Sequence, residues 1–237
     1  MAQRRDFLRA FGPRPGERIL DVGAGPGFLA NEIAEAIGST GSVCGIDISE
    51  PLLEVARSKE GNKYGIDFRY GDVTQLPFQD EEFDSVVSTQ VLEYVPDVNA
   101  ALAEIHRVLK PGGRVGLLDT DWDSIVWHSP DKQKMNRILR AWEDHAADPF
   151  LPRTLARKLH AAGFSVERQE VIPLFNNEYD PDTYSNRIID LIVSFVVERN
   201  SISKEDADGW AEELRSCGLN GEYFFSLNRY FFLATKS

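Results

Sequence analysis

Short apolar runs alternate along the chain with longer segments whose apolar residues recur at helical spacing. Such runs are typical of strands buried in a parallel sheet, and the segments between them are typical of covering helices. The expected strands are residues 18–22, 42–48, 66–70, 82–88, 115–118, 165–172 and 223–235. The expected helices are residues 4–11, 28–37, 49–58, 100–109, 131–147, 151–162, 183–197 and 203–216. This alternation predicts an α/β fold with a doubly wound, seven-stranded, mostly parallel sheet.

A glycine-rich turn follows the first expected strand, with the sequence LDVGAGPG over residues 20–27. Gly23 and Gly25 permit backbone conformations and a close ligand approach that a Cβ would block. The turn and the start of the next helix are expected to direct backbone N–H groups at a ligand. Asp21 lies at the carboxyl end of the strand, where open α/β sheets bind ligands. Phe28 stands where a dinucleotide fingerprint has its third glycine, which disfavours an NAD site.

An acidic residue ends the second expected strand. Asp47 lies 24 residues beyond Gly23, and a carboxylate at that place can accept two hydrogen bonds from a ribose diol. The alternative is that Asp47 only assists the start of the helix over residues 49–58.

Several segments together resemble the class I S-adenosylmethionine-dependent methyltransferases, in particular the group of ubiquinone and menaquinone biosynthesis. These segments are LDVGAGPG at 20–27, GDVTQLPF at 71–78, FDSV at 83–86 and LKPGG at 109–113. The resemblance is strong over residues 19–118 and covers the remainder only in outline. It implies a Rossmann-like methyltransferase fold whose last strand is antiparallel, with S-adenosylmethionine as the cofactor. The Asn/Asp-Pro-Pro-Tyr tetrad is absent from the loop after the fourth strand, which disfavours DNA bases and glutamine as substrates.

The resemblance also implies which residues hold the cofactor. The glycine turn would meet the methionine part, Asp47 the ribose, and Asp72 with its neighbour Val73 the adenine, whose amino group needs an acceptor. Asp72 has the alternative reading of a turn-forming residue. The full expected set is Asp21, Gly23, Ala24, Gly25, Asp47, Ile48, Asp72, Val73 and Gln90.

The acceptor side of the site is expected after the fifth strand. Residues 119–128 carry three aspartates beside Trp122 and Trp127, which could embrace a cation or an aromatic ring. The alternative is that the acids are solvated and the tryptophans pack against a helix. About 50 residues separate the last two strands, more than the family fold needs. Residues 1–237 are therefore expected to form one domain, with a cofactor-binding half at 12–120 and a helical lid at 121–150 and 176–220.

Candidate general bases come from these later segments. They are His128, Asp121 and Tyr179, with Tyr184 as a further candidate, and histidine is the side chain most often used as a general base. A loop histidine can equally be structural or solvated. The expected reaction is in-line methyl transfer to an oxygen, carbon or nitrogen of a small molecule, such as an aromatic or secondary metabolite. The alternatives are a protein or tRNA methyltransferase, and a cofactor-binding regulator without catalysis.

Composition narrows the partners. The net charge of −12 disfavours a nucleic acid, whose phosphates are bound by Lys and Arg. The only two cysteines, Cys44 and Cys217, predict neither a disulfide framework nor a metal site. A magnesium site at Asp119, Asp121 and Asp123 is disfavoured because alternate residues of a strand face opposite sides. No membrane span or signal peptide is expected, which favours a cytoplasmic protein. We further expect a monomer or homodimer and no bound metal.

Overall fold

The computed structural model describes residues 2–58 and 60–237, which divide into two compact units. Unit 1 comprises Met1–Thr120, Leu151–Ile172 and Tyr230–Ser237. Unit 2 comprises Asp121–Phe150 and Pro173–Arg229. Each unit has its own hydrophobic core, so each is described separately.

The centre of unit 1 is a parallel sheet around β1 (Arg18–Val22). On one side of β1 lie β2 (Ser42–Asp47) and then β3 (Asp67–Tyr70); on the other lie β4 (Phe83–Thr89) and then β5 (Leu109–Thr120). The full strand order is β3-β2-β1-β4-β5-β8-β6, and β7 pairs with β8. The strand order reverses between β1 and β4, and ligands of open α/β sheets bind at such a switch point.

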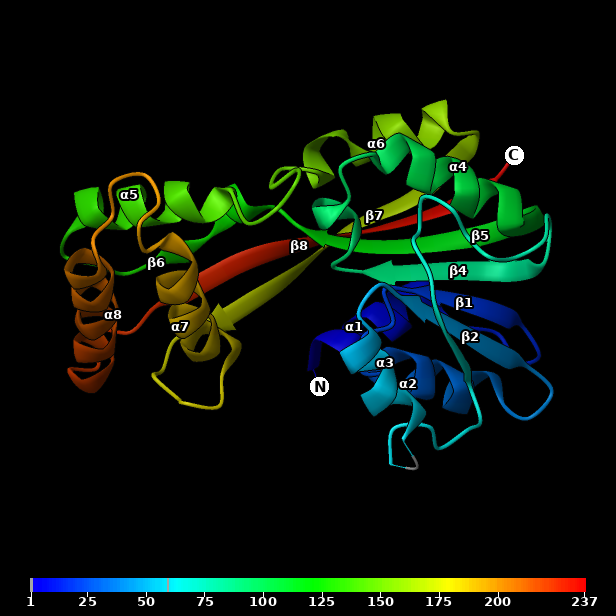
Figure 1. The fold of residues 1–237 in the computed structure, drawn as a ribbon, viewed down its shortest axis with the longest axis horizontal. Helices are drawn as coiled ribbons and strands as arrows, with labels where there is room; N and C mark the ends of the chain where they lie inside the picture. The colour runs from blue at the N-terminus through cyan, green and yellow to red at the C-terminus, as the bar shows by residue number, and fades with distance from the viewer. Residues whose placement is uncertain (1, 59) are drawn as a thin grey trace. The chain divides into compact units, whose positions relative to one another are not determined.

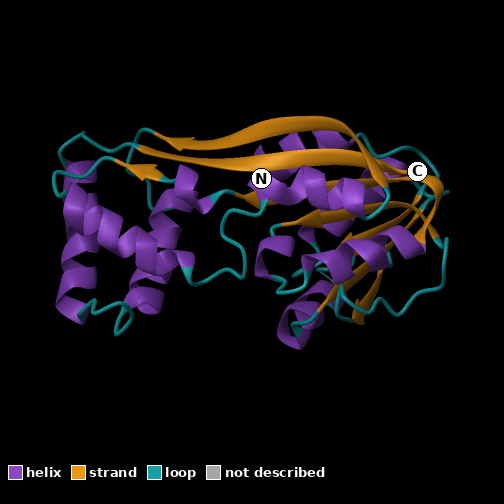
Figure 2. Ribbon diagram, turned by 90° about the horizontal axis from the view of Figure 1, so that it is seen from above, coloured by secondary structure: helices purple, strands orange, loops and turns teal. Residues whose placement is uncertain are grey.

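Helices cover both faces of this sheet (Figures 1 and 2). One face carries α4 (Val98–Val108) and α6 (Pro152–Ala161), whose buried leucines and isoleucines pack on β4 and β5. The other face carries α1 (Ala2–Phe11), α2 (Phe28–Ile37) and α3 (Glu50–Arg57). A strand buried on both faces needs apolar side chains on both, which explains the continuous apolar runs.

The predicted fold class is confirmed, and its last strand is antiparallel. The last two long strands are β7 (Phe164–Asn176) and β8 (Phe225–Lys236), and β7 extends beyond the predicted end at residue 172. The sheet has one strand more than the seven predicted, because β6 (Val126–Trp127) pairs antiparallel with residues 225–226 of β8. A two-residue strand is too short to show a period of two in the sequence.

The fifth strand was expected over residues 115–118, and its start is wrong, because β5 already begins at Leu109. In β5, Leu109 pairs with Phe83 and Arg114 pairs with Ser85, so residues 110–113 bulge out within the strand. Gly112 has a φ of +71°, which suits glycine in this bulge.

Unit 2 is mainly helical. Its helices are α5 (Lys132–Glu143), α7 (Tyr184–Val196) and α8 (Lys204–Leu219). The short 3₁₀ helix η2 (Trp122–Ser124) and the strand β6 precede them in the chain. Trp122 and Trp127 are buried in its core: Trp122 meets Trp142 edge to face at 5.7 Å, and Trp127 meets Trp210 at 5.6 Å. The expectation that these two tryptophans embrace a ligand is therefore wrong, because their rings are used in packing.

Among the described residues, no helix combines the length and the apolar composition that crossing a bilayer requires.

Candidate functional site

A cavity of about 540 Å³ lies in unit 1 where β1, β2 and β4 end. Its volume falls within the range of ~300–1,000 Å³ that is usual for small-molecule sites. Six predicted cofactor residues line it: Gly23, Asp47, Ile48, Asp72, Val73 and Gln90. The other lining residues are Val22, Ile46, Gly71, Thr74, Val91, Tyr94, Val95, Pro96 and Asp97.

The glycine turn contributes Gly23 to the lining of this cavity. Gly23 has a φ of +73°, and a Cβ there would lie 2.1 Å from Cγ2 of Val91. The N–H groups of Gly23 and Ala24 both donate to the carbonyl of Ile46 at 2.8 Å, and the N–H of Gly25 donates to Asp47. The expectation that the turn directs N–H groups at a ligand is thus wrong for these three, which are bonded within the protein, and stays a prediction for the start of the helix over residues 28–37. The turn instead supplies close approach and a fixed shape.

Asp47 lies at the end of β2 and is half-buried at the cavity. Its Oδ2 accepts the N–H of Gly25 and its Oδ1 accepts the N–H of Ser49, the residue before α3, each at 2.8 Å. Each carboxylate oxygen has a second lone pair. Asp47 can therefore support the helix start and still accept hydrogen bonds from two hydroxyls.

Asp72 is exposed at the cavity and also organises its own turn. Its Oδ1 accepts the N–H and the hydroxyl of Thr74, each at 2.8 Å. Among the described residues, Oδ2 has no hydrogen-bond partner, so this oxygen is available as an acceptor for an adenine amino group.

Asp21, Ala24 and Gly25 are not among the residues that line the cavity. Asp21 is only 1 % exposed, and its Oδ2 has no hydrogen-bond partner among the described residues. Burial, with a further contribution from the charge of Asp47, raises the pKa of Asp21 to about 8, although the N–H of Ala30 opposes this shift. A carboxyl group in this state would gain from a nearby cation.

A network that the sequence did not reveal links the cavity to the end of β5. Gln90, with a φ of +58°, donates from Nε2 to the hydroxyl of Thr120 at 2.7 Å. Glu93, in η1 (Leu92–Tyr94), accepts the N–H of Thr120 at 2.5 Å, and its own N–H donates to Asp119 at 3.2 Å.

Glu93 and Asp119 are both fully buried. Burial and the charge of Glu93 raise the pKa of Asp119. The sequence signal for this pair is an acid within the otherwise apolar segment VLEYV at residues 91–95. The pair holds the loop after β4 against β5, and so fixes one wall of the cavity.

The candidate bases all lie in unit 2. Asp121 is buried and accepts the N–H of Asp123 at 3.2 Å, at the start of η2. The ring of Tyr179 packs against that of Tyr223 with centroids 5.4 Å apart. The guanidinium of Arg229 lies 4.9 Å from the ring of Tyr184. His128 is exposed. The catalytic roles of these residues stay predictions.

Comparisons with known proteins agree with the geometry of unit 1. A family model described as a methyltransferase domain matches residues 20–117. A demethylmenaquinone methyltransferase of Staphylococcus aureus is 43 % identical over 122 residues, which are 52 % of this chain and 51 % of that protein. An uncharacterised 37.1 kDa protein in a transposon of Streptomyces fradiae is 38 % identical over 173 residues, which are 71 % of this chain and 48 % of that protein. The chain thus spans about half the length of these curated relatives.

A solved structure supports the fold over the whole chain. It comes from Bacillus halodurans, is provisionally described as a methyltransferase, and covers 100 % of this chain and 99 % of its own. The TM-score is 0.70 at 20 % sequence identity. At this identity the likeness concerns the fold.

Proposed function

The chain belongs to the class I S-adenosylmethionine-dependent methyltransferases, and on this premise we propose that it methylates a small molecule. The observation that carries the proposal is the cavity at the β1/β4 switch point, which lies within the matched residues and is lined by two available acids. Asp47 and Asp72 provide acceptors on neighbouring strand ends, as a nucleoside needs.

The residues present fit the cofactor. We assign the ribose hydroxyls to Asp47 and the adenine amino group to Asp72. Gly23 lets Val91 pack directly against the turn, because a Cβ there would lie 2.1 Å from Cγ2 of Val91, and this packing shapes the wall that we assign to the methionine part. Asp21 does not line the cavity, but its buried carboxyl group in β1 has one unpartnered oxygen and would be stabilised in its charged form by a positive charge bound nearby.

Bound S-adenosylmethionine supplies a methyl group that is already activated by the sulfonium. The chain's task is therefore to align the acceptor and to exclude water. We propose that residues 121–150 and 176–220 form the lid that does this. A base among His128, Asp121 and Tyr179 is required only for an acceptor that keeps its proton until transfer.

Among small molecules, we propose a reduced quinone or a related phenol as the acceptor class. The similarity to a demethylmenaquinone methyltransferase supports it. An amine would need an accessible acid, and Asp123 is the one exposed aspartate of the three at 119–123, whereas Asp119 and Asp121 are buried. A nucleic acid is disfavoured by the net charge of −12.

The test is transfer of labelled methyl groups from S-adenosylmethionine. The acceptors are a demethylated naphthoquinol, a catechol and an alkylamine, followed by a metabolite extract. We expect label in the naphthoquinol or the catechol. Label confined to the amine would contradict the acceptor class, and cofactor binding without transfer to any acceptor would favour the non-catalytic regulator.

A further inference from the structure

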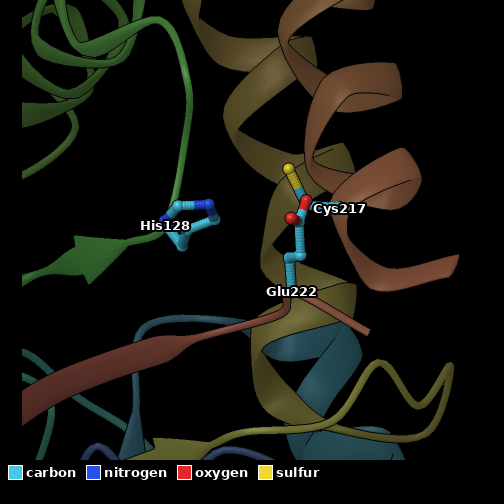
Figure 3. A group of neighbouring side chains, drawn as sticks. All are labelled: His128, Cys217 and Glu222. Atoms are coloured by element: carbon cyan, nitrogen blue, oxygen red, sulfur yellow. The ribbon is translucent and has the colours of Figure 1, made fainter. Parts of the chain in front are cut away.

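Three potential metal ligands from separate segments of unit 2 converge. His128 follows β6, Cys217 lies in the last turn of α8, and Glu222 lies between α8 and β8. One ligand atom of each lies within 4.8 Å of the other two. Figure 3 shows the imidazole of His128 facing the thiol of Cys217 and the carboxylate of Glu222.

The backbone holds these three residues in place. Gly221, with a φ of +75°, reverses the chain after α8, and the N–H of Glu222 then donates to the carbonyl of Cys217 at 2.9 Å. On the other side, the N–H of His128 donates to the carbonyl of Phe224 at 3.0 Å. Because these bonds flank the cluster, its geometry follows from the fold of unit 2.

Another acid near the cluster is already engaged. Glu213 precedes Cys217 by one helical turn and accepts a hydrogen bond from the hydroxyl of Ser129. Its other oxygen lies 3.2 Å from Nζ of Lys134. Glu213 therefore carries a satisfied charge, and the ligand set remains one thiol, one imidazole and one carboxylate.

We propose that His128, Cys217 and Glu222 bind one divalent ion of the zinc class. A thiolate and an imidazole select a borderline-soft transition metal and disfavour Mg²⁺ and Ca²⁺, which take oxygen ligands. On binding, the thiol of Cys217 releases its proton to solvent, so one thiolate and one carboxylate neutralise the two charges of the ion.

The distances suit a site that tightens around the ion. Bonds of about 2.0–2.3 Å in a tetrahedron place the ligand atoms about 3.4–3.8 Å apart. Cys217 is buried, whereas His128 and Glu222 are exposed and can close in by side-chain rotation. Three protein ligands leave the fourth position to water. The ion would cross-link β6, α8 and the segment before β8, and so stabilise unit 2.

The test uses tag-free, reduced protein and needs no activity, so its outcome is independent of the proposed methyl transfer. Zn²⁺ is titrated in competition with a chromophoric chelator, and Co²⁺ is added to a second sample to detect thiolate-to-cobalt charge transfer. We expect binding of about one equivalent, with the charge-transfer band present. Absence of the band, or of competitive Zn²⁺ binding, would overturn the proposal.

Matched variants locate the site. Cys217→Ser should abolish the cobalt band, and His128→Ala and Glu222→Gln should weaken Zn²⁺ binding by about 10-fold or more. The controls are Cys44→Ser, His160→Ala and Glu212→Gln, which change the same residue types elsewhere and should bind like the wild type. Equal loss in the controls would contradict the assignment.

A measurement on the wild type covers variants that fail to fold. Iodoacetamide labelling, followed by peptide mass spectrometry, should show that Zn²⁺ slows modification of Cys217 and leaves Cys44 unchanged. Equal labelling of Cys217 with and without Zn²⁺ would count against the site. The variants also distinguish the proposed role of His128 as a metal ligand from its predicted role as a general base, because only the metal site also requires Cys217 and Glu222.

Discussion

At the residue scale, we predict that Asp21 couples cofactor binding to pH. Burial and the nearby charge of Asp47 raise its pKa to about 8, against the hydrogen bond from the N–H of Ala30. A bound cation favours the carboxylate and lowers this pKa, so binding releases a proton. Affinity for S-adenosylmethionine should therefore rise from pH 6 to pH 8, by at most about 10-fold per pH unit.

Calorimetry in buffers of different ionisation enthalpy measures this proton release. The variant Asp21→Asn keeps the size of the side chain but cannot ionise. It should bind the cofactor more weakly and with little dependence on pH over this range. A wild-type affinity that stays flat, or a variant with the same slope as the wild type, would refute the role of Asp21.

At the element scale, the turn after β1 depends on the absence of one side chain. Gly23→Ala would place a Cβ 2.1 Å from Val91 at a φ of +73°. We expect a loss of about 1–3 kcal/mol in the free energy of unfolding and a loss of cofactor affinity, because the turn or the loop after β4 must shift. Urea denaturation and calorimetry measure the two effects.

Gly209 provides the matched control. It lies in α8, and a Cβ there has open space. Gly209→Ala should raise stability by about 0.5–1 kcal/mol, because alanine favours a helix over glycine, and should leave cofactor affinity unchanged. If Gly209→Ala lost stability and cofactor affinity as Gly23→Ala does, the geometry at Gly23 would not be the cause of these losses.

The elements that could be predicted are those with a strong local signal. The strands β1, β2 and β4 have buried, largely apolar centres, and α2 and α4 carry their apolar residues at helical spacing. These patterns predict where the strands around the cavity end and where the helices after them begin. The bulge in β5 and the two-residue β6 are set by pairing with distant strands, so no local pattern announces them.

At the scale of the whole molecule, the two units differ in how far the sequence predicts them. Six of the nine expected cofactor residues line the cavity in unit 1, because strand ends alone place them at one sheet edge. In unit 2, the aromatic and acidic side chains of residues 121–128 resemble a binding surface, yet Asp121 and Trp122 are buried, and Trp122 packs against Trp142 of α5. Burial between distant segments is a tertiary property that composition does not reveal.

The convergence of His128, Cys217 and Glu222 is likewise a tertiary property that the sequence does not reveal. His128 is far from Cys217 and Glu222 in the chain, so the two cysteines by themselves gave no indication of a metal site. The turn at Gly221 and the pairing of β6 with β8 bring them together.

The central claim is that the cavity in unit 1 holds S-adenosylmethionine through Asp47. Calorimetric titration with S-adenosylmethionine and S-adenosylhomocysteine tests it most directly. The proteins compared are the wild type, Asp47→Asn and the control Asp67→Asn. Asp67 is an exposed acid of β3 that pairs with Arg69. We predict that the wild type and Asp67→Asn bind both compounds alike, and that Asp47→Asn binds them about 10-fold more weakly or worse, since hydrogen bonds to a charged group contribute about 1.5–3 kcal/mol. No binding by the wild type at millimolar concentration, or unchanged affinity in Asp47→Asn, would contradict the claim.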